Sequence, residues 1–136
     1  MKKRIFILAA LLSTGLIGSM TATTKSSHSE IMTKEADGSY IINTTTLGKD
    51  VRGFRGNTPL TIHIKKGKII DIKPLANQET PKFFNKVKQE LLNKWNGMKV
   101  SKAASVQVDG VTGATFSSKA VKENVKRGIA YYRKHK

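Results

Sequence analysis

The stretch PLTIHIKKGKIIDIKPL, residues 59–75, decides the fold, because it reads as two strands joined by a tight turn. Apolar residues alternate with polar ones on both strands, which is typical of strands with one face on a core. These apolar positions are Leu60, Ile62 and Ile64 on the first strand and Ile70 and Ile72 on the second. Lys66 and Gly67 mark the turn, since glycine supplies a positive φ without steric cost. The pattern predicts an antiparallel hairpin.

A helix is predicted directly after the hairpin, over residues 79–97. Thr80 can serve as its N-cap, Pro81 suits the first helical position, and Gly97 is a natural stop. Its apolar residues recur at helical spacing and form one buried stripe. They are Phe83, Phe84, Val87, Leu91, Leu92 and Trp95.

Two further strands and a second helix complete the expected domain. The strands are SYIINTTT (39–46) and AASVQVD (103–109), and a glycine-rich loop, GKDVRGFRGN (48–57), follows the first of them. The last helix runs from about Ser118 to the C-terminus, and its buried stripe is Val121, Val125, Ile129 and Tyr132. The fold class predicted is α+β: a small, mostly antiparallel sheet with a hairpin, packed against two helices.

Composition and charge restrict the classes of function. The 136 residues include no cysteine, which excludes disulfides, thiolate metal sites and a cysteine nucleophile. The histidines His28, His63 and His135 are scattered without metal-ligand spacing, so we assign no metal. The net charge of +16 suggests acidic partners or anionic lipids. We expect no nucleic-acid partner, because the chain has an export leader and no nucleic-acid-binding motif.

The N-terminus has the pattern of a secretory leader. Lys2, Lys3 and Arg4 precede an apolar run that is short for a membrane span, which predicts a signal peptide over residues 1–22. Its removal takes the net charge from +16 to +13, and an uncleaved anchor is the alternative. Residues 23–38 are polar and are predicted to be a flexible linker before a domain over 39–136. Both alternatives place the domain outside the cytoplasm.

The stretch VDGVTGATFSSKAV, residues 108–121, combines a strand end, a glycine turn and a helix start. The free N–H groups of such a turn can bind an anion, and Gly110 and Gly113 let the backbone approach a ligand. Ser117 and Ser118 can cap the helix or donate to a phosphate. The alternative is a plain capped turn. The stretch matches neither a Walker loop nor a nucleophile elbow.

Residues 109–115, DGVTGAT, resemble the flavinylation motif of the FMN-binding domain family, Asp-x-x-Ser/Thr-Gly-Ala-Thr. That family includes flavin-carrying subunits of the sodium-pumping NADH:quinone reductase and of Rnf complexes, and small exported flavoproteins. The resemblance extends over residues 53–133 and includes a similar glycine–strand–GKI–strand–ETP segment. It implies FMN esterified through its phosphate to Thr115, attached by a separate magnesium- and FAD-dependent flavin transferase. Thr112 stands where serine is common in the family.

The resemblance also suggests roles for neighbouring residues. Thr112, Gly113, Ala114, Ser117 and Ser118 would support the site. Asp109 would order the turn or be recognised by the transferase. Glu79 and Thr80 would approach the flavin ring, or serve only as a helix cap. Phe116, Trp95 and Tyr40 could stand beside the ring, but aromatic residues of small domains are more often core residues. Arg52 and Arg55 could screen the phosphate, but solvation is the interpretation we favour for these arginines.

These inferences together predict an exported, single-domain flavoprotein with covalent FMN on Thr115. It would carry electrons between a membrane-associated donor and an extracytoplasmic acceptor, and its partners would be the flavin transferase and redox proteins. The sequence indicates no substrate pocket and no catalytic residue, so we expect a redox carrier more than a complete enzyme. The alternative function is a basic binding module without flavin that holds an anionic ligand or partner.

Overall fold

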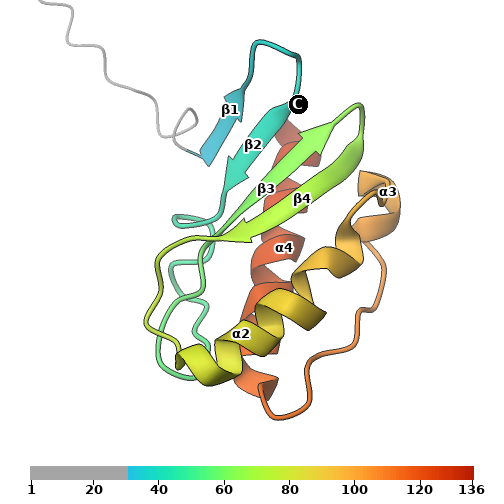
Figure 1. Cartoon of the computed structure of the whole chain (residues 1–136). Coiled ribbons are helices and arrows are strands. Elements are labelled where there is room, and N and C mark those ends of the chain that lie inside the picture. The colour runs from blue at the N-terminus through green and yellow to red at the C-terminus, as the bar shows by residue number, and fades with distance from the viewer. Residues whose placement is uncertain (1–30) are drawn as a thin grey trace, which may run out of the picture.

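The computed structural model describes residues 31–136 (Figure 1). Four antiparallel strands form one sheet in the order β1-β2-β3-β4: β1 (Met32–Lys34), β2 (Tyr40–Asn43), β3 (Leu60–Lys65) and β4 (Lys68–Pro74). The helical elements are α2 (Pro81–Glu90), the short 3-10 helix η1 (Leu92–Trp95), α3 (Val100–Ala103) and α4 (Thr115–His135). Figure 1 shows α4 along one face of the sheet, with α2 and α3 beside β4. The predicted α+β fold class is confirmed.

The β3–β4 hairpin forms as predicted, with one difference in register. Lys66 and Gly67 have φ of 51° and 74°, as expected for a two-residue turn with both residues left-handed. Ile62 pairs with Ile72, but Ile64 pairs with Ile69, so Ile70 is an extra residue at a bulge. A bulge shifts the alternation by one, which buries Ile69 and leaves Ile70 44% exposed. The prediction that Ile70 shares the buried face of Ile72 is therefore wrong.

The sheet begins earlier in the chain than predicted. Residues 32–34 form β1 and pair with β2, with Met32 opposite Ile42. The flexible linker predicted for residues 23–38 is therefore wrong over residues 32–38, where a strand and a turn lie instead. Edge strand β1 is mostly exposed, so its polar residues give little strand signal. The predicted signal peptide and the linker's first residues lie outside the described part of the chain.

Residues 103–109 do not form the predicted strand. The short helix α3 ends at Ala103, and no strand is assigned over residues 104–111. The outer edge of β4 is already occupied, because the N–H of Ile69 donates to the carbonyl of Met98 at 2.9 Å and the N–H of Gly97 donates to the carbonyl of Ile69 at 2.7 Å. Residues 97 and 98 therefore pair with the start of the β4 edge in place of the predicted strand at 103–109.

The helices largely follow the prediction. Thr80 stands at the N-cap position of α2 with an extended backbone and Pro81 is the first helical residue, but the Thr80 side chain makes no capping hydrogen bond. The helix ends at Glu90 and η1 follows. The buried stripe of α4 is confirmed, although the helix begins at Thr115, three residues before the predicted start. Ser117 and Ser118 are thus inside the helix instead of capping it. Among residues 31–136, no helix has both the length and the apolar character needed to cross a bilayer.

Helix α4 approaches the sheet most closely at Gly128. A Cβ at this position would lie 2.5 Å from Ile62 Cδ1 and 3.1 Å from Thr44 Cγ2, and both of these side chains are fully buried. Gly128→Val is expected to lower the free energy of unfolding by about 1–3 kcal/mol, because the extra methyl groups overpack this contact. Chemical denaturation measures the change. Ala130→Val, at an exposed site on the same helix, is the control, and an equal loss in both variants would contradict the packing argument.

Candidate functional site

The glycine turn before α4 is fixed to the first turn of the helix. The carbonyl of Val111 accepts the N–H of Ala114 at 3.0 Å, and Gly113 has φ of 85°, as the third residue of a type II turn requires. The N–H of Val111 donates to Ser118 Oγ at 2.9 Å. Thr115 follows the turn as the first residue of α4, and its side chain is exposed.

The carboxylate of Glu79 connects three segments beneath this turn. It is buried, with 5% of the residue exposed. Its Oε1 accepts the N–H of Phe54 at 2.8 Å and the hydroxyl of Ser117 at 2.9 Å, and its Oε2 accepts the N–H of Arg55 at 2.7 Å. Glu79 therefore fixes the glycine-rich loop to the start of α4, from a position just before α2.

Glycine at position 53 allows this carboxylate to approach the loop. A Cβ on Gly53 would overlap Glu79 Oε1 and would lie 3.2 Å from Thr58 Cγ2. Gly53→Ala is expected to lower the free energy of unfolding by about 3 kcal/mol, because the carboxylate must leave its backbone donors. Thermal or urea unfolding measures the loss.

Gly56→Ala is the matched control in the same loop. The nearest atom to a Cβ at Gly56 is Gln78 Cβ at 4.0 Å, which is ordinary van der Waals contact. We expect this variant to change the free energy of unfolding by less than about 1 kcal/mol. If the two glycine variants lose the same stability, the close approach of Glu79 to Gly53 is not what the loop depends on.

The rest of the glycine-rich loop is held by side-chain amides and a guanidinium. Asn57 Nδ2 donates to three carbonyls of residues 48–51, and Asn124 Nδ2 on α4 donates to the carbonyl of Thr58 at 3.0 Å. Arg127 donates to Asp50 through two nitrogens, and these hydrogen bonds hold the pKa of the Asp50 carboxyl below its usual range. The loop that carries Phe54 is thereby fixed against α4.

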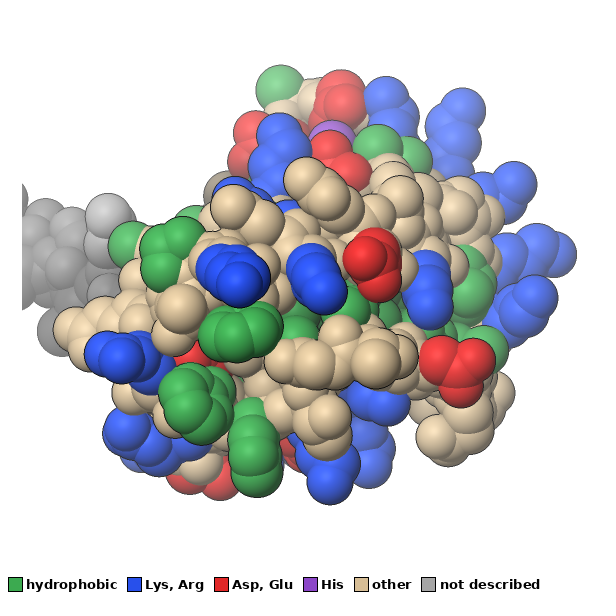
Figure 2. All heavy atoms as spheres, turned by 60° about the horizontal axis from the view of Figure 1, so that its bottom comes forward, with side chains coloured by type: hydrophobic (Ala, Val, Ile, Leu, Met, Phe, Trp, Pro, Cys, Tyr) green, Lys and Arg blue, Asp and Glu red, His purple; other side chains and the backbone are tan. Residues whose placement is uncertain are grey.

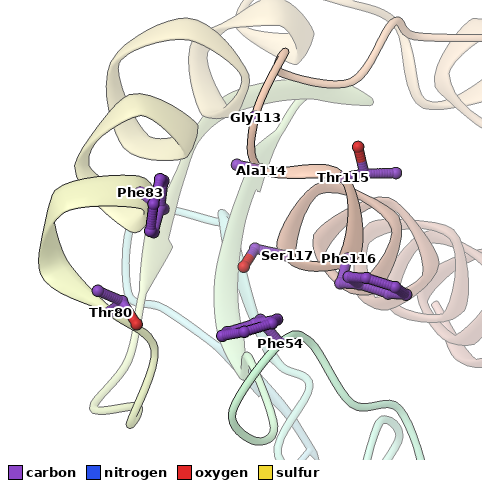
Figure 3. A pocket seen from close by; sticks show the side chains of 8 residues that line it. All are labelled: Phe54, Thr80, Phe83, Gly113, Ala114, Thr115, Phe116 and Ser117. Carbon is purple, nitrogen blue, oxygen red and sulfur yellow. The ribbon is translucent and has the colours of Figure 1, made fainter.

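An apolar cavity of about 320 Å³ opens between the glycine-rich loop, α2 and α4. We call it the aromatic cavity. Its lining residues are Phe54, Thr80, Phe83, Gly113, Ala114, Thr115, Phe116 and Ser117 (Figure 3). The rings of Phe54 and Phe116 are 64% and 62% exposed, and their centroids lie 6.4 Å apart. Figure 3 shows Phe83 on α2 across the cavity from Phe116.

The aromatic cavity lies on an unusually apolar part of the surface. Figure 2, which brings forward the end of the molecule where α2 and α4 begin, shows hydrophobic side chains standing out among lysines and arginines. The exposed phenylalanines of the described residues are Phe54, Phe83 and Phe116, and all three line the cavity. A cluster of exposed aromatic rings around a hollow is typical of a ligand or partner site.

A second hollow, of about 290 Å³, lies on the other side of Thr115, and we call it the cationic hollow. It is lined by Gly110, Val111, Thr112, Thr115, Ser118, Lys119 and Lys122. Lys119 stands one helical turn after Thr115, so the two side chains are neighbours on the helix surface. The first N–H groups of α4 have no acceptor within the helix, and together with the lysines they favour an anion here. Thr115 thus belongs to both the aromatic cavity and the cationic hollow.

Most of the predicted site residues come together around these two hollows. Thr80, Gly113, Ala114, Thr115, Phe116 and Ser117 line the aromatic cavity, Thr112, Thr115 and Ser118 line the cationic hollow, and Glu79 lies beneath them. Asp109 is exposed and does not line either hollow, and its carbonyl accepts Lys94 Nζ at 3.5 Å. Arg52 donates to the carbonyl of Arg55 at 3.2 Å.

Two of the aromatic residues considered for the flavin ring lie away from the two hollows, Trp95 in the core and Tyr40 half-buried against it. Trp95 is buried in η1, with 3% of its surface exposed. Tyr40 contacts the ring of Tyr132 edge-on at 5.4 Å, near the C-terminal end of α4. Since each helical residue advances 1.5 Å, Tyr132 is about 25 Å along the helix from Thr115. Both residues therefore pack in or against the core, as is usual for aromatic residues of small domains, and not beside the candidate site.

Sequence reasoning missed four residues of the site: Phe54, Phe83, Lys119 and Lys122. An aromatic residue between two arginines in a glycine-rich loop was a usable signal for Phe54, because such loops rarely bury a large ring. Helical spacing predicts Phe83 in the buried stripe of its helix, but this residue is 41% exposed, so that prediction is wrong. Lys119 is four residues after Thr115, the spacing that puts two side chains on one helix face.

Comparison with known proteins gives consistent matches. The family model of the FMN-binding domain matches residues 53–130, which include the Phe54 loop, Glu79 and the turn before Thr115. The chain is 32% identical over 127 residues to the G subunit of the ion-translocating oxidoreductase complex of Shewanella piezotolerans, covering 84% of this chain and 58% of that protein. It is 34% identical over 97 residues to the same subunit from Shewanella oneidensis, covering 61% of this chain and 45% of that protein.

The chain thus spans about half the length of these relatives. No solved structure gives a significant match. The family match covers more than half of the chain and includes both hollows around Thr115. From this match, and from the motif at residues 109–115 that leads into α4, we conclude that the chain belongs to the FMN-binding domain family.

Proposed function

We propose that this protein is an exported flavoprotein that carries electrons, with FMN joined through a phosphoester to the Thr115 hydroxyl. The observation that carries the proposal is the position of Thr115. Its exposed side chain lies where the aromatic cavity meets the cationic hollow, which is flanked by Lys119 and Lys122. An aromatic cavity suits the isoalloxazine ring, and a cationic hollow suits the phosphate that would join it to the protein.

Thr115 is the hydroxyl best placed for attachment in its segment. Ser117 is buried and donates to Glu79, and Ser118 is buried and accepts the N–H of Val111. Thr112 is exposed and lines the cationic hollow, but it does not line the aromatic cavity. Only Thr115 among these four is both exposed and shared by the two hollows.

The residues around the site fit FMN in size and character. The aromatic cavity of about 320 Å³ is at the lower end of the range of about 300–1,000 Å³ for small-molecule pockets. Phe54, Phe83 and Phe116 can contact a flat ring and exclude water from part of it. Lys119 and the first N–H groups of α4 can bind a phosphate. When bound, FMN supplies the electron-transfer chemistry, and the protein orients it.

The attachment we propose is made by a separate flavin transferase that uses FAD and magnesium. A bond forms between Thr115 Oγ and the phosphorus of the FMN half of FAD, the pyrophosphate bond breaks, and AMP leaves. The hydroxyl proton passes to a base on the transferase. The exposure of Thr115 supports this proposal, because a second protein must reach the hydroxyl.

The location and partners belong to the same proposal. The leader-like residues 1–22 support export to the outer side of the cell membrane. The relatives, which are named as subunits of an ion-translocating oxidoreductase complex, support a membrane-associated redox partner. We propose that the chain passes electrons between such a donor and an extracytoplasmic acceptor. A covalent link would keep the cofactor on a domain whose site is open to solvent.

Intact mass after co-expression with a flavin transferase tests the proposal. We expect a species heavier than the unmodified chain by the mass of FMN less one water, with a yellow colour that survives denaturation and dialysis. Flavinylation of a known acceptor in the same cells shows that the transferase is active. An unmodified mass under these conditions would contradict the covalent link and favour the basic binding module.

The aromatic cavity gives a separate prediction about access to the attached cofactor. The double variant Phe54→Ser, Phe116→Ser is expected to keep its covalent cofactor and to show stronger quenching of flavin fluorescence by iodide. Because both rings are mostly exposed, we expect its free energy of unfolding to change by about 0.5 kcal/mol or less.

Ile70→Ser, at an exposed apolar site on β4, is the control for this variant and should leave iodide quenching unchanged. Equal quenching in the wild type and the double phenylalanine variant would mean that the ring does not lie in the aromatic cavity.

A further inference from the structure

A strongly cationic hollow lies at the end of the molecule opposite the aromatic cavity. Its volume is about 430 Å³, and we call it the basic hollow. Its lining residues are Lys66, Gly67, Lys68, Lys99, Val100, Ser101, Tyr132, Arg133 and Lys136. Five of these carry a positive charge, and none of them is an aspartate or a glutamate. Figure 1 places the β3–β4 turn, α3 and the C-terminal end of α4 at this end.

Backbone contacts hold the cationic segments of the basic hollow together. Lys68 and Lys99 form an antiparallel bridge, and the N–H of Val100 donates to the carbonyl of Gly67 at 2.9 Å. Lys66 takes a left-handed backbone with φ of 51°, which the tight hairpin turn requires. The arrangement therefore belongs to the fold and does not depend on how the lysine side chains move.

This grouping of like charges is electrostatically unfavourable in the isolated chain. Asp37, on the turn before β2, does not neutralise these cations. It is not among the lining residues, and its carboxylate already accepts from Lys65 at 3.0 Å and from the N–H and hydroxyl of Ser39. Lys136 Nζ lies over the Tyr132 ring, 5.9 Å from its centroid. An anionic partner that enters the basic hollow would relieve the repulsion among its five cations.

The number of charges indicates which anion fits. A single phosphate group carries about −1.5 to −2 at pH 7, which leaves most of the five cations unmatched. A surface that presents many phosphates matches them better. Single-stranded nucleic acid would also need exposed aromatic rings for base stacking, but Tyr132, the aromatic residue of the lining, is only 3% exposed. A bilayer with anionic headgroups has no such need.

We propose that the basic hollow binds the phosphate headgroups of an anionic lipid bilayer. Arg133 suits such a group because its guanidinium can donate two parallel hydrogen bonds to a phosphate. Arg133 follows Thr115 on the same helix, and the separation of the two residues is about 27 Å along its axis. A chain held to the membrane by the basic hollow therefore presents its aromatic cavity away from the lipid.

Co-sedimentation with vesicles tests the proposal, with the full chain as it is isolated from cells. The vesicles contain either phosphatidylcholine alone or phosphatidylcholine with phosphatidylglycerol. The charge-reversal variant Lys68→Glu, Lys99→Glu, Arg133→Glu is compared with Lys86→Glu, Lys88→Glu, Lys126→Glu, which has the same net charge and changes exposed lysines elsewhere. We expect the first variant to bind anionic vesicles at least about a hundredfold more weakly than the wild type.

The second variant should keep most of its binding, and about 0.5 M salt should release the wild type because the interaction is electrostatic. Equal losses in the two variants, or equal binding of the wild type to neutral vesicles, would overturn the proposal. If inorganic phosphate releases the protein from the vesicles more strongly than chloride does at equal ionic strength, the hollow is a single-phosphate site instead. Binding to a single-stranded oligonucleotide that is lost only in the first variant would indicate a nucleic-acid site. Circular dichroism of both variants verifies that they are folded.

Discussion

Thr115→Val is expected to abolish the covalent flavin completely, and Thr112→Val is expected to retain it. Valine has nearly the shape of threonine but has no hydroxyl, so the phosphoester cannot form while the start of α4 keeps its packing. Thr112 is the matched control, because it is the other exposed threonine of the turn and it lines only the cationic hollow. Intact mass after co-expression with the transferase measures both outcomes.

The same experiment separates attachment from binding. Thr115→Val can still hold free FMN weakly in the aromatic cavity, but dialysis under denaturing conditions removes a cofactor that is not covalently bound. An adduct that persists in Thr115→Val and disappears in Thr112→Val would move the attachment to the cationic side of the turn. Loss of the adduct in both variants would indicate that the transferase recognises the turn as a whole.

Glu79→Ala is expected to lower the free energy of unfolding by at least about 3 kcal/mol, because it leaves three buried or part-buried donors without their acceptor. These donors are the N–H groups of Phe54 and Arg55 and the hydroxyl of Ser117. Urea denaturation measures the loss. Glu90→Ala, at an exposed site on the last turn of α2, is the control and should change stability by about 0.5 kcal/mol or less.

The predicted clash between position 53 and Glu79 adds a sharper test of this junction. Gly53→Ala should cost much less stability in the Glu79→Ala background than in the wild type, because its Cβ then no longer meets the carboxylate. Additive losses in this double-mutant cycle would show that the two residues act independently. A Glu79→Ala variant as stable as Glu90→Ala would mean that the carboxylate does not hold the loop to α4.

Local pattern in the sequence was enough to predict the elements whose partners are close in the chain. The β3–β4 hairpin follows from its turn residues Lys66 and Gly67, and the start of α2 follows from Pro81 at the first helical position. The strand predicted at 103–109 fails because the edge of β4 is taken by residues near Met98, which no local pattern reveals. The bulge at Ile70 likewise depends on how β3 and β4 pair. The alternation of apolar and polar residues along β4 by itself does not reveal it.

The candidate site divides in the same way. Thr115 was predicted from its resemblance to a family motif, and the glycine turn before it follows from Gly113. Phe54 was not predicted because its position depends on Glu79, 25 residues further along the chain. Trp95 and Tyr40 are candidates for the flavin ring only because they are aromatic. Trp95 is buried in the core, and Tyr40 packs against Tyr132 far from Thr115, which decides against both. Aromatic residues become informative once their exposure is known.

The position of the modification on the peptide tests the central claim most directly. Trypsin cleaves after Lys102 and Lys119, which yields the peptide Ala103–Lys119 with Thr112, Thr115, Ser117 and Ser118 inside it. After co-expression with the transferase, fragmentation of this peptide should place the mass of FMN less one water on Thr115. A peptide that carries this mass on Thr112, Ser117 or Ser118, or that is unmodified while a known acceptor is flavinylated, would contradict the account.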